Sequence, residues 1–171
     1  MRIPVFVSCP TALNPAQEAS RQIINGLLDE MNLEPRALGR SDYPVALPLR
    51  EVFVIARHCA GGIILGFSQL LAKTAVVKPG TAKQTEVVDV HVPTAWNHLE
   101  AGILYSIGLP LLVFREAWIT GGIFDLGVSD VFVNDMPLSG QTNIGDLREM
   151  FLKWRGKVSQ IYYNDSPISR N

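Results

Sequence analysis

The chain has 171 residues, of which 47% are hydrophobic and 18% are charged, and its formal net charge is −1. This composition is typical of one compact globular domain and excludes an intrinsically disordered chain. The charge is close to zero and no basic cluster is present, which argues against a nucleic-acid-binding protein and leaves small molecules and other proteins as partners.

The segment 1–12 contains one arginine and a short apolar run that is interrupted by Pro4. It predicts a buried strand and not a signal peptide. No run of about 18 apolar residues occurs, so we expect no membrane span. The two cysteines, Cys9 and Cys59, are too few for a disulfide framework or a metal site, and they indicate reduced thiols and a cytoplasmic location.

Apolar runs that read as fully buried strands alternate with helical patterns along the chain. Asn14 as N-cap, Pro15 in the first turn and Gln17 completing a capping box predict the start of a helix whose buried stripe ends at Met31. The other expected helices are 48–59, 95–105 and 144–158. The expected strands are 3–8, 33–38, 61–66, 109–114 and 128–133.

This alternation predicts an α/β fold, a flavodoxin-like three-layer sandwich with a five-stranded, mostly parallel central sheet. We expect the strand order 2-1-3-4-5, with the first strand inside the sheet. A single domain is expected over 1–163, followed by a flexible tail over 164–171. The region 67–92 is the least regular and is interpreted as a long functional loop that covers a site and could include an added hairpin strand.

Sheets of this kind bind their ligands at the carboxyl ends of the strands. In this chain those ends are Ser8–Cys9, the loop 39–43, the segment 66–68 and Arg115–Glu116. The helix that follows Thr94 begins at the same edge. The sequence therefore predicts that the functional side chains meet there.

Pro93 and the N-cap residue Thr94 predict where the helix 95–105 begins. Trp96 and Asn97 adjoin Glu100 at spacings of four and three residues, which places the three side chains together. We expect Glu100 to lie near the surface as a functional group, the alternative being a solvated helix glutamate beside a half-buried tryptophan. Trp96 could stack on a base or form a wall of the site, the alternative being a core tryptophan. The side chains expected to face the core are Leu99, Ala101, Gly102 and Ile103.

The segment 94–100 reads TAWNHLE and resembles the Ser/Thr-x-Trp-Cys-x-x-Glu pattern of TIR domains, whose bacterial and neuronal enzymes cleave NAD. The strand 5–8 is similar to the TIR opening. Segments 94–102 and 108–111 also resemble, with poorer spacing, a motif of the nucleoside 2-deoxyribosyltransferases. The resemblance implies that Glu100 is the catalytic carboxylate, with Asn97 where cysteine is usual.

Both families break a bond between a ribosyl carbon and a base nitrogen, through an oxocarbenium-like transition state. A fixed carboxylate can stabilise that cation or attack it. Nicotinamide leaves NAD as a neutral molecule and needs no strong acid. A purine or pyrimidine would need a proton donor, and His98 and Asp42 are candidates for that role.

Around the catalytic Glu100, the expected substrate-binding residues are Ser8, Cys9, Arg40, Asp42, Phe67, Trp96 and Asn97. Arg40 and Arg50 could hold a pyrophosphate, the alternative being ordinary surface arginines. We expect no metal and no cofactor, because NAD or a related nucleotide is the substrate itself.

The resulting hypothesis is an N-glycosidase that hydrolyses or cyclises NAD and resembles components of bacterial anti-phage defence, which implies a defence-system partner protein. The alternatives are a nucleoside or nucleotide deoxyribosyltransferase or hydrolase, and a non-catalytic interaction or nucleotide-sensing module. Self-association is expected, because TIR-type sites are often completed by a second copy and a loop carries apolar residues with little to cover them. These residues are Trp118, Ile119, Ile123 and Phe124.

Overall fold

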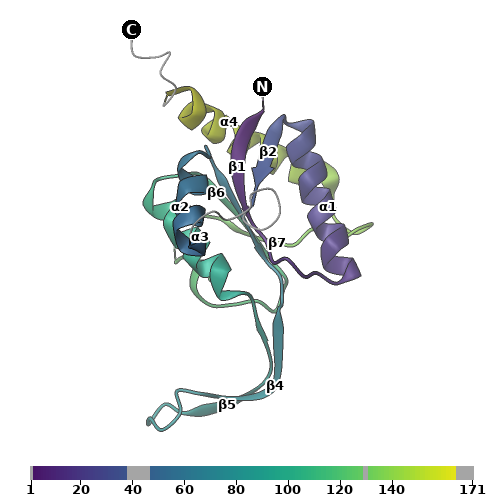
Figure 1. The fold of residues 1–171 in the computed structure, drawn as a ribbon. Coiled ribbons are helices and arrows are strands. Elements are labelled where there is room, and N and C mark those ends of the chain that lie inside the picture. The colour runs from purple at the N-terminus through teal and green to yellow at the C-terminus, as the bar shows by residue number, and fades with distance from the viewer. Residues whose placement is uncertain (1, 38–46, 129–130, 165–171) are drawn as a thin grey trace.

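The structure, a computed structural model, describes residues 2–37, 47–128 and 131–164. Its centre is a five-stranded, all-parallel sheet in the order β2-β1-β3-β6-β7 (Figure 1). Numbered by their occurrence in this sheet, the strands follow the predicted order 2-1-3-4-5, and β1 lies inside the sheet between β2 and β3. The strands are β1 (Ile3–Ser8), β2 (Leu33–Arg36), β3 (Gly62–Gly66), β6 (Leu111–Arg115) and β7 (Val133–Asp135).

Two pairs of helices cover the two faces of the sheet and complete the predicted three layers (Figure 1). One core cluster joins the sheet to α1 (Pro15–Glu30) and α4 (Ile144–Asn164), and the other joins it to α2 (Pro48–Arg57) and α3 (Ala95–Ser106). Successive side chains of a strand point to opposite faces, so Val5 and Val7 enter the first cluster whereas Phe6 enters the second.

The start of α1 confirms the predicted capping box. The Asn14 side chain accepts a hydrogen bond from the backbone N–H of Gln17 (2.9 Å), and Gln17 Oε1 accepts one from the backbone N–H of Asn14 (3.1 Å). These bonds satisfy donors that the first helical turn leaves without intrahelical partners. They need only neighbouring residues, which is why the sequence was sufficient to predict them.

Several element boundaries differ from the prediction, among them those of β2, β7 and α4. Strand β2 ends at Arg36, and β7 spans Val133–Asp135, where it pairs with β6, and not 128–133. Helix α4 continues to Asn164. The remainder of the expected tail, 165–171, lies outside the described residues.

The region 67–92 contains an ordered hairpin, so the hairpin strand that the sequence allowed is present, whereas the expectation that the region is mostly irregular was wrong. Strands β4 (Leu70–Val77) and β5 (Thr85–Val92) pair antiparallel in a separate two-stranded sheet. The hairpin projects away from the sandwich (Figure 1). Its valine- and threonine-rich composition favours strands.

In the part of the chain that the structure describes, no helix has the length and hydropathy needed to cross a membrane.

The glycines of β3 allow close packing against neighbouring side chains. A Cβ atom on Gly66 would lie 2.5 Å from Cε1 of Phe124, a fully buried ring that has little room to move. We therefore expect Gly66→Ala to lower the free energy of unfolding by about 1–3 kcal/mol.

The matched control is Gly26→Ala within α1, where a Cβ atom would meet nothing within 4 Å. This change should leave stability unchanged or raise it by roughly 0.5–1 kcal/mol, because alanine favours helix more than glycine does. Urea denaturation of both variants compares them. Equal stability of the two would contradict the close packing at Gly66.

Candidate functional site

The start of α3 lies over the point where the sheet changes direction. The chain runs from β1 outward to β2 and then returns to the other side of β1 as β3, which makes the β1/β3 boundary the switch point where such sheets bind ligands. Asn97 Nδ2 donates hydrogen bonds to Ser8 Oγ at the end of β1 (2.8 Å) and to the Leu65 carbonyl in β3 (3.4 Å). One side chain of α3 therefore connects the two strands at this point.

The buried face of α3 differs from the predicted one. Its buried residues are Asn97, Glu100, Ala101 and Leu104. Leu99 is 48% exposed, Gly102 is exposed and Ile103 is only half-buried, so of the four residues predicted to face the core only Ala101 is fully buried.

Leu104 explains the rotation of α3. Its methyl groups fill the space beside Gly62, where a Cβ atom would lie 2.8 Å from Leu104 Cδ1. Asn97, Glu100 and Ala101 precede Leu104 by seven, four and three residues, so they share its face. This spacing was present in the sequence and could have identified the buried stripe.

Glu100 is buried, with 9% of its surface exposed, so the expectation that it lies near the surface was wrong. Burial raises the pKa of its carboxyl group to about 7, and a hydrogen bond with Ser8 acts in the opposite direction. The charged form loses hydration in the protein interior, whereas the Ser8 hydroxyl stabilises it. Near neutral pH the carboxyl group therefore exists in both forms, as acid–base catalysis requires.

The structure brings together three of the expected site residues, Ser8, Asn97 and Glu100. Ser8 is 1% exposed, accepts the hydrogen bond from Asn97 Nδ2 and hydrogen-bonds to Glu100. Trp96, on the same helix, is 40% exposed and thus does not belong to the core. Its indole is therefore exposed enough to contact a ligand.

Cys9 and Phe67 lie on the opposite face of the sheet from α3. Both contact the core cluster beneath α1 and α4, and Phe67 is completely buried there. The period of two along a strand separates them from Glu100, because Cys9 follows Ser8 directly. Their side chains do not contribute to the cluster around Glu100.

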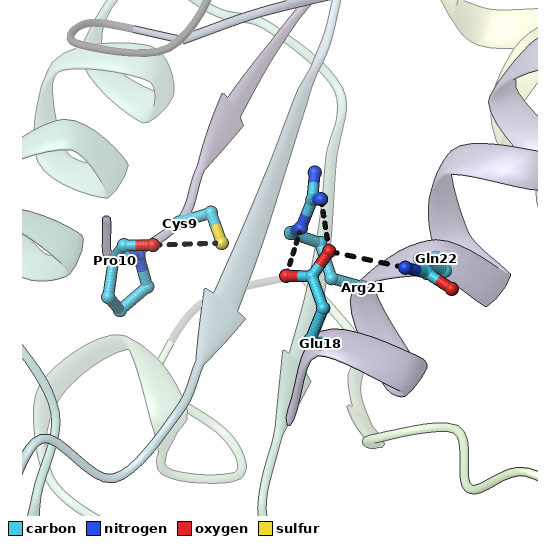
Figure 2. Close-up of polar contacts among 5 residues, drawn as sticks. All are labelled: Cys9, Pro10, Glu18, Arg21 and Gln22. Carbon is cyan, nitrogen blue, oxygen red and sulfur yellow. Dashed lines mark hydrogen bonds and ion pairs between the residues drawn. The ribbon is translucent and has the colours of Figure 1, made fainter. Parts of the chain in front are cut away.

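Figure 2 shows the surroundings of Cys9. Its Sγ donates to the Pro10 carbonyl (3.5 Å), and Glu18 of α1 forms an ion pair with Arg21 and accepts a hydrogen bond from Gln22. The hydrogen bond with Glu18 raises the pKa of Arg21, and Cys9 adds to this effect. Cys9 thus borders the first turns of α1.

Two expected site residues, Arg40 and Asp42, lie outside the described residues. Arg50 is on α2 and is exposed. A hollow of about 360 Å³ on α2 is lined by Phe53, Val54, Arg57 and His58. No residue proposed for the Glu100 cluster lines this hollow, so we assign it no part in the site.

A second polar cluster at the same edge of the sheet was not predicted. Glu116 accepts hydrogen bonds from the Ser68 backbone N–H (2.6 Å) and from Gln17 Nε2 (3.2 and 3.3 Å). Ser68 Oγ lies 2.9 Å from His91 Nδ1, and the His91 ring lies 5.1 Å from that of Trp118. The sequence marked 66–68 and 115–116 as strand ends but gave no signal that these residues bond to one another.

The Ser68–His91 pair has the spacing of a nucleophile and its base, but its surroundings do not support acyl transfer. The backbone N–H groups of Ser68 and Gln69 donate to Glu116 and to the Val92 carbonyl, so neither can stabilise an oxyanion. The contacts instead attach the base of the hairpin to the sheet. Among the described residues, no three His, Cys, Asp or Glu side chains group so as to hold a metal ion.

The apolar loop from which self-association was predicted is largely internal. Ile119 and Phe124 are fully buried and Ile123 is half-buried, whereas Trp118 is 54% exposed. Arg115 Nη1 donates to the carbonyls of Ile119 (2.8 Å) and Phe124 (3.0 Å) and so draws the loop onto the core. Three of the four residues therefore provide no exposed apolar patch.

The chain matches no protein-family model, and no curated protein matches it. The features of the chain that point to a function are therefore the geometry around Glu100 and the motif of residues 94–100.

Proposed function

We propose that the protein is an N-glycosidase that breaks the ribosyl–nicotinamide bond of NAD or the corresponding bond of a related nucleotide, with Glu100 as the acting carboxylate. The observation that supports this most is the placement of Glu100. Its carboxyl group is buried, hydrogen-bonded to Ser8, and located at the switch point of a parallel sheet.

A carboxylate in this position suits the chemistry. The transition state of glycosidic cleavage carries positive charge on the ribose, and a fixed negative charge in a poorly hydrated site stabilises it more than water does. The nicotinamide of NAD departs neutral, so one carboxylate is sufficient. The product is ADP-ribose if water attacks, or a cyclic form if the nucleotide itself attacks.

The raised pKa supports a second candidate, a nucleoside or nucleotide deoxyribosyltransferase or hydrolase. At and below neutral pH a large share of Glu100 is protonated. A protonated carboxyl group can donate to the nitrogen of a departing purine or pyrimidine, which nicotinamide does not need. The non-catalytic nucleotide-sensing module is the third candidate.

Chromatography of the purified protein incubated with NAD, and separately with deoxynucleosides with and without a second base, separates these candidates. Nicotinamide release supports the first proposal, and base exchange or base release from deoxynucleosides supports the second. No turnover of any substrate, combined with nucleotide binding in calorimetry, would favour the sensing module.

The pH dependence of NAD cleavage provides a separate prediction. If Glu100 acts as a carboxylate, kcat should fall about tenfold per pH unit below the pKa of about 7 and level off above it. A decrease above pH 7 would contradict the carboxylate role and would instead indicate that Glu100 donates a proton.

The role in anti-phage defence and a defence-system partner protein are parts of this proposal that follow from the TIR resemblance. A cytoplasmic location is also proposed, from the two cysteines. Self-association also remains part of the proposal. Sedimentation velocity at micromolar concentration, with and without NAD, should show a species larger than the monomer. A monomer under both conditions would contradict this expectation.

A further inference from the structure

Asn97 has a buried oxygen atom without a donor. Its side chain is completely buried, and its Nδ2 donates to Ser8 and to the Leu65 carbonyl. A carbonyl oxygen can only accept, so the nitrogen of the amide must face Leu65. Oδ1 then has no hydrogen-bond partner among the described residues. Such an atom is costly to leave unpaired, which makes a nearby donor worth identifying.

Glu100 supplies a buried donor. Its raised pKa means that below neutral pH the group is a neutral acid with one O–H. The hydrogen bond with Ser8 lowers this pKa, so in that bond the Ser8 hydroxyl is the donor and a Glu100 oxygen the acceptor. The proton of Glu100 itself therefore needs another acceptor.

The two groups are neighbours. Asn97 and Glu100 are three residues apart on α3, and each is hydrogen-bonded to Ser8, in the case of Asn97 through Ser8 Oγ at 2.8 Å. A buried acceptor without a donor and a carboxyl group that is a donor when neutral thus lie beside the same hydroxyl group.

We propose that neutral Glu100 donates its proton to Asn97 Oδ1, so that Asn97, Ser8 and Glu100 form a closed ring of three hydrogen bonds. Asn97 donates to Ser8, Ser8 donates to Glu100, and Glu100 donates to Asn97. Asn97 and Ser8 are then positioning residues that fix the carboxyl group of Glu100. Ionisation of Glu100 removes its hydrogen bond to Asn97. The carboxylate then keeps only the hydrogen bond from Ser8, and its other oxygen can act on a ligand.

Charged groups on neighbouring elements do not account for the behaviour of Glu100. Helix α3 packs against β1, β3, α2 and the short turn 122–124. Of these, β1, β3 and the turn carry no ionisable side chain among their residues. Besides Glu100, the ionisable residues of α2 and α3 are Arg50, Glu51, Arg57, His98 and Tyr105, and none of them is among the causes of the shift in the pKa of Glu100.

Infrared spectroscopy tests the ring without any need for turnover. Well below the pKa of Glu100, the carbonyl band that is present in the wild type and absent from Glu100→Gln belongs to the neutral acid. This band has a lower frequency when the O–H group donates a hydrogen bond. In Asn97→Leu, which has similar volume and no acceptor, the band should move to higher frequency.

An unchanged band in Asn97→Leu would overturn the ring, and Asn97→Ala provides the same comparison if the leucine variant does not fold. Ser8→Ala should leave the hydrogen bond from Glu100 to Asn97 Oδ1 in place but shift the midpoint of the band's pH titration upward by about 1 unit, since a donor to the charged form is lost. An unchanged midpoint would show that Ser8 does not donate to Glu100.

The matched control is Ser20→Ala. Ser20 is also buried, but its hydroxyl donates to the Ala16 carbonyl within α1. Its removal should change neither the band nor its midpoint. The catalytic use of the ring depends on the proposed function, whereas the ring itself does not, so a failed spectroscopic test and an absence of NAD cleavage would be distinguishable results.

Discussion

Glu100→Gln should lower the turnover of NAD or nucleoside by a hundredfold or more. Glutamine keeps the size of the side chain but cannot carry the negative charge that opposes the developing oxocarbenium ion. Loss of such a preorganised charge typically costs about 3 kcal/mol or more in transition-state stabilisation. Initial rates measured by chromatography at pH 8, where about nine-tenths of the wild-type carboxyl groups are charged, provide the comparison.

Glu149→Gln is the matched control. Glu149 is exposed on α4, which covers the opposite face of the sheet, so the same chemical change there should leave the rate unchanged. Equal activity of the wild type and Glu100→Gln would refute the proposed mechanism. If the wild type and Glu100→Gln are both folded but inactive, the nucleotide-sensing module would be favoured.

The second large effect concerns the pH dependence of stability. The folded protein retains the proton of Glu100 up to pH about 7, whereas the unfolded chain releases it near the ordinary value of 4.5. Between these values the folded state binds more protons, so the stability contributed by this group falls as pH rises and is lost above pH about 7. The shift corresponds to roughly 3 kcal/mol.

Glu100→Gln should remove this decline. Relative to the wild type, the variant should gain roughly 3 kcal/mol of stability between pH 4.5 and pH 8, because glutamine has no charge to bury. Urea denaturation across this range measures the difference, and other titrating groups cancel because both proteins share them. If the difference in unfolding free energy between Glu100→Gln and the wild type does not change with pH, as we expect for Glu149→Gln, then Glu100 is not desolvated.

This expectation replaces the one that the sequence suggested. A surface glutamate would tolerate substitution with almost no effect on folding, but Glu100 faces the core of the sandwich. Activity and stability of Glu100→Gln should therefore be compared at a pH where both proteins are fully folded.

The sequence alone determined the features that depend on neighbouring residues. The capping box at Asn14 and Gln17 uses bonds within one helical turn, and the apolar strands predicted a parallel sheet whose order follows from alternation with helices. The motif of residues 94–100 also placed Asn97 and Glu100 together, because spacings of three and four residues are local properties of a helix.

The tertiary structure decided which of these side chains are buried and what they contact. The packing of Leu104 against Gly62 places the face of α3 that carries Glu100 against the core. Because neighbouring side chains of a strand alternate in direction, Ser8 points toward α3 and Cys9 points away from it. Arg115 likewise draws Ile119 and Phe124 into the core. The pKa of Glu100 follows from burial by residues distant in sequence. Local spacing shows which side chains share a face of a helix or strand. Which face is buried, and how strongly its polar groups are desolvated, depends on the element that packs against it.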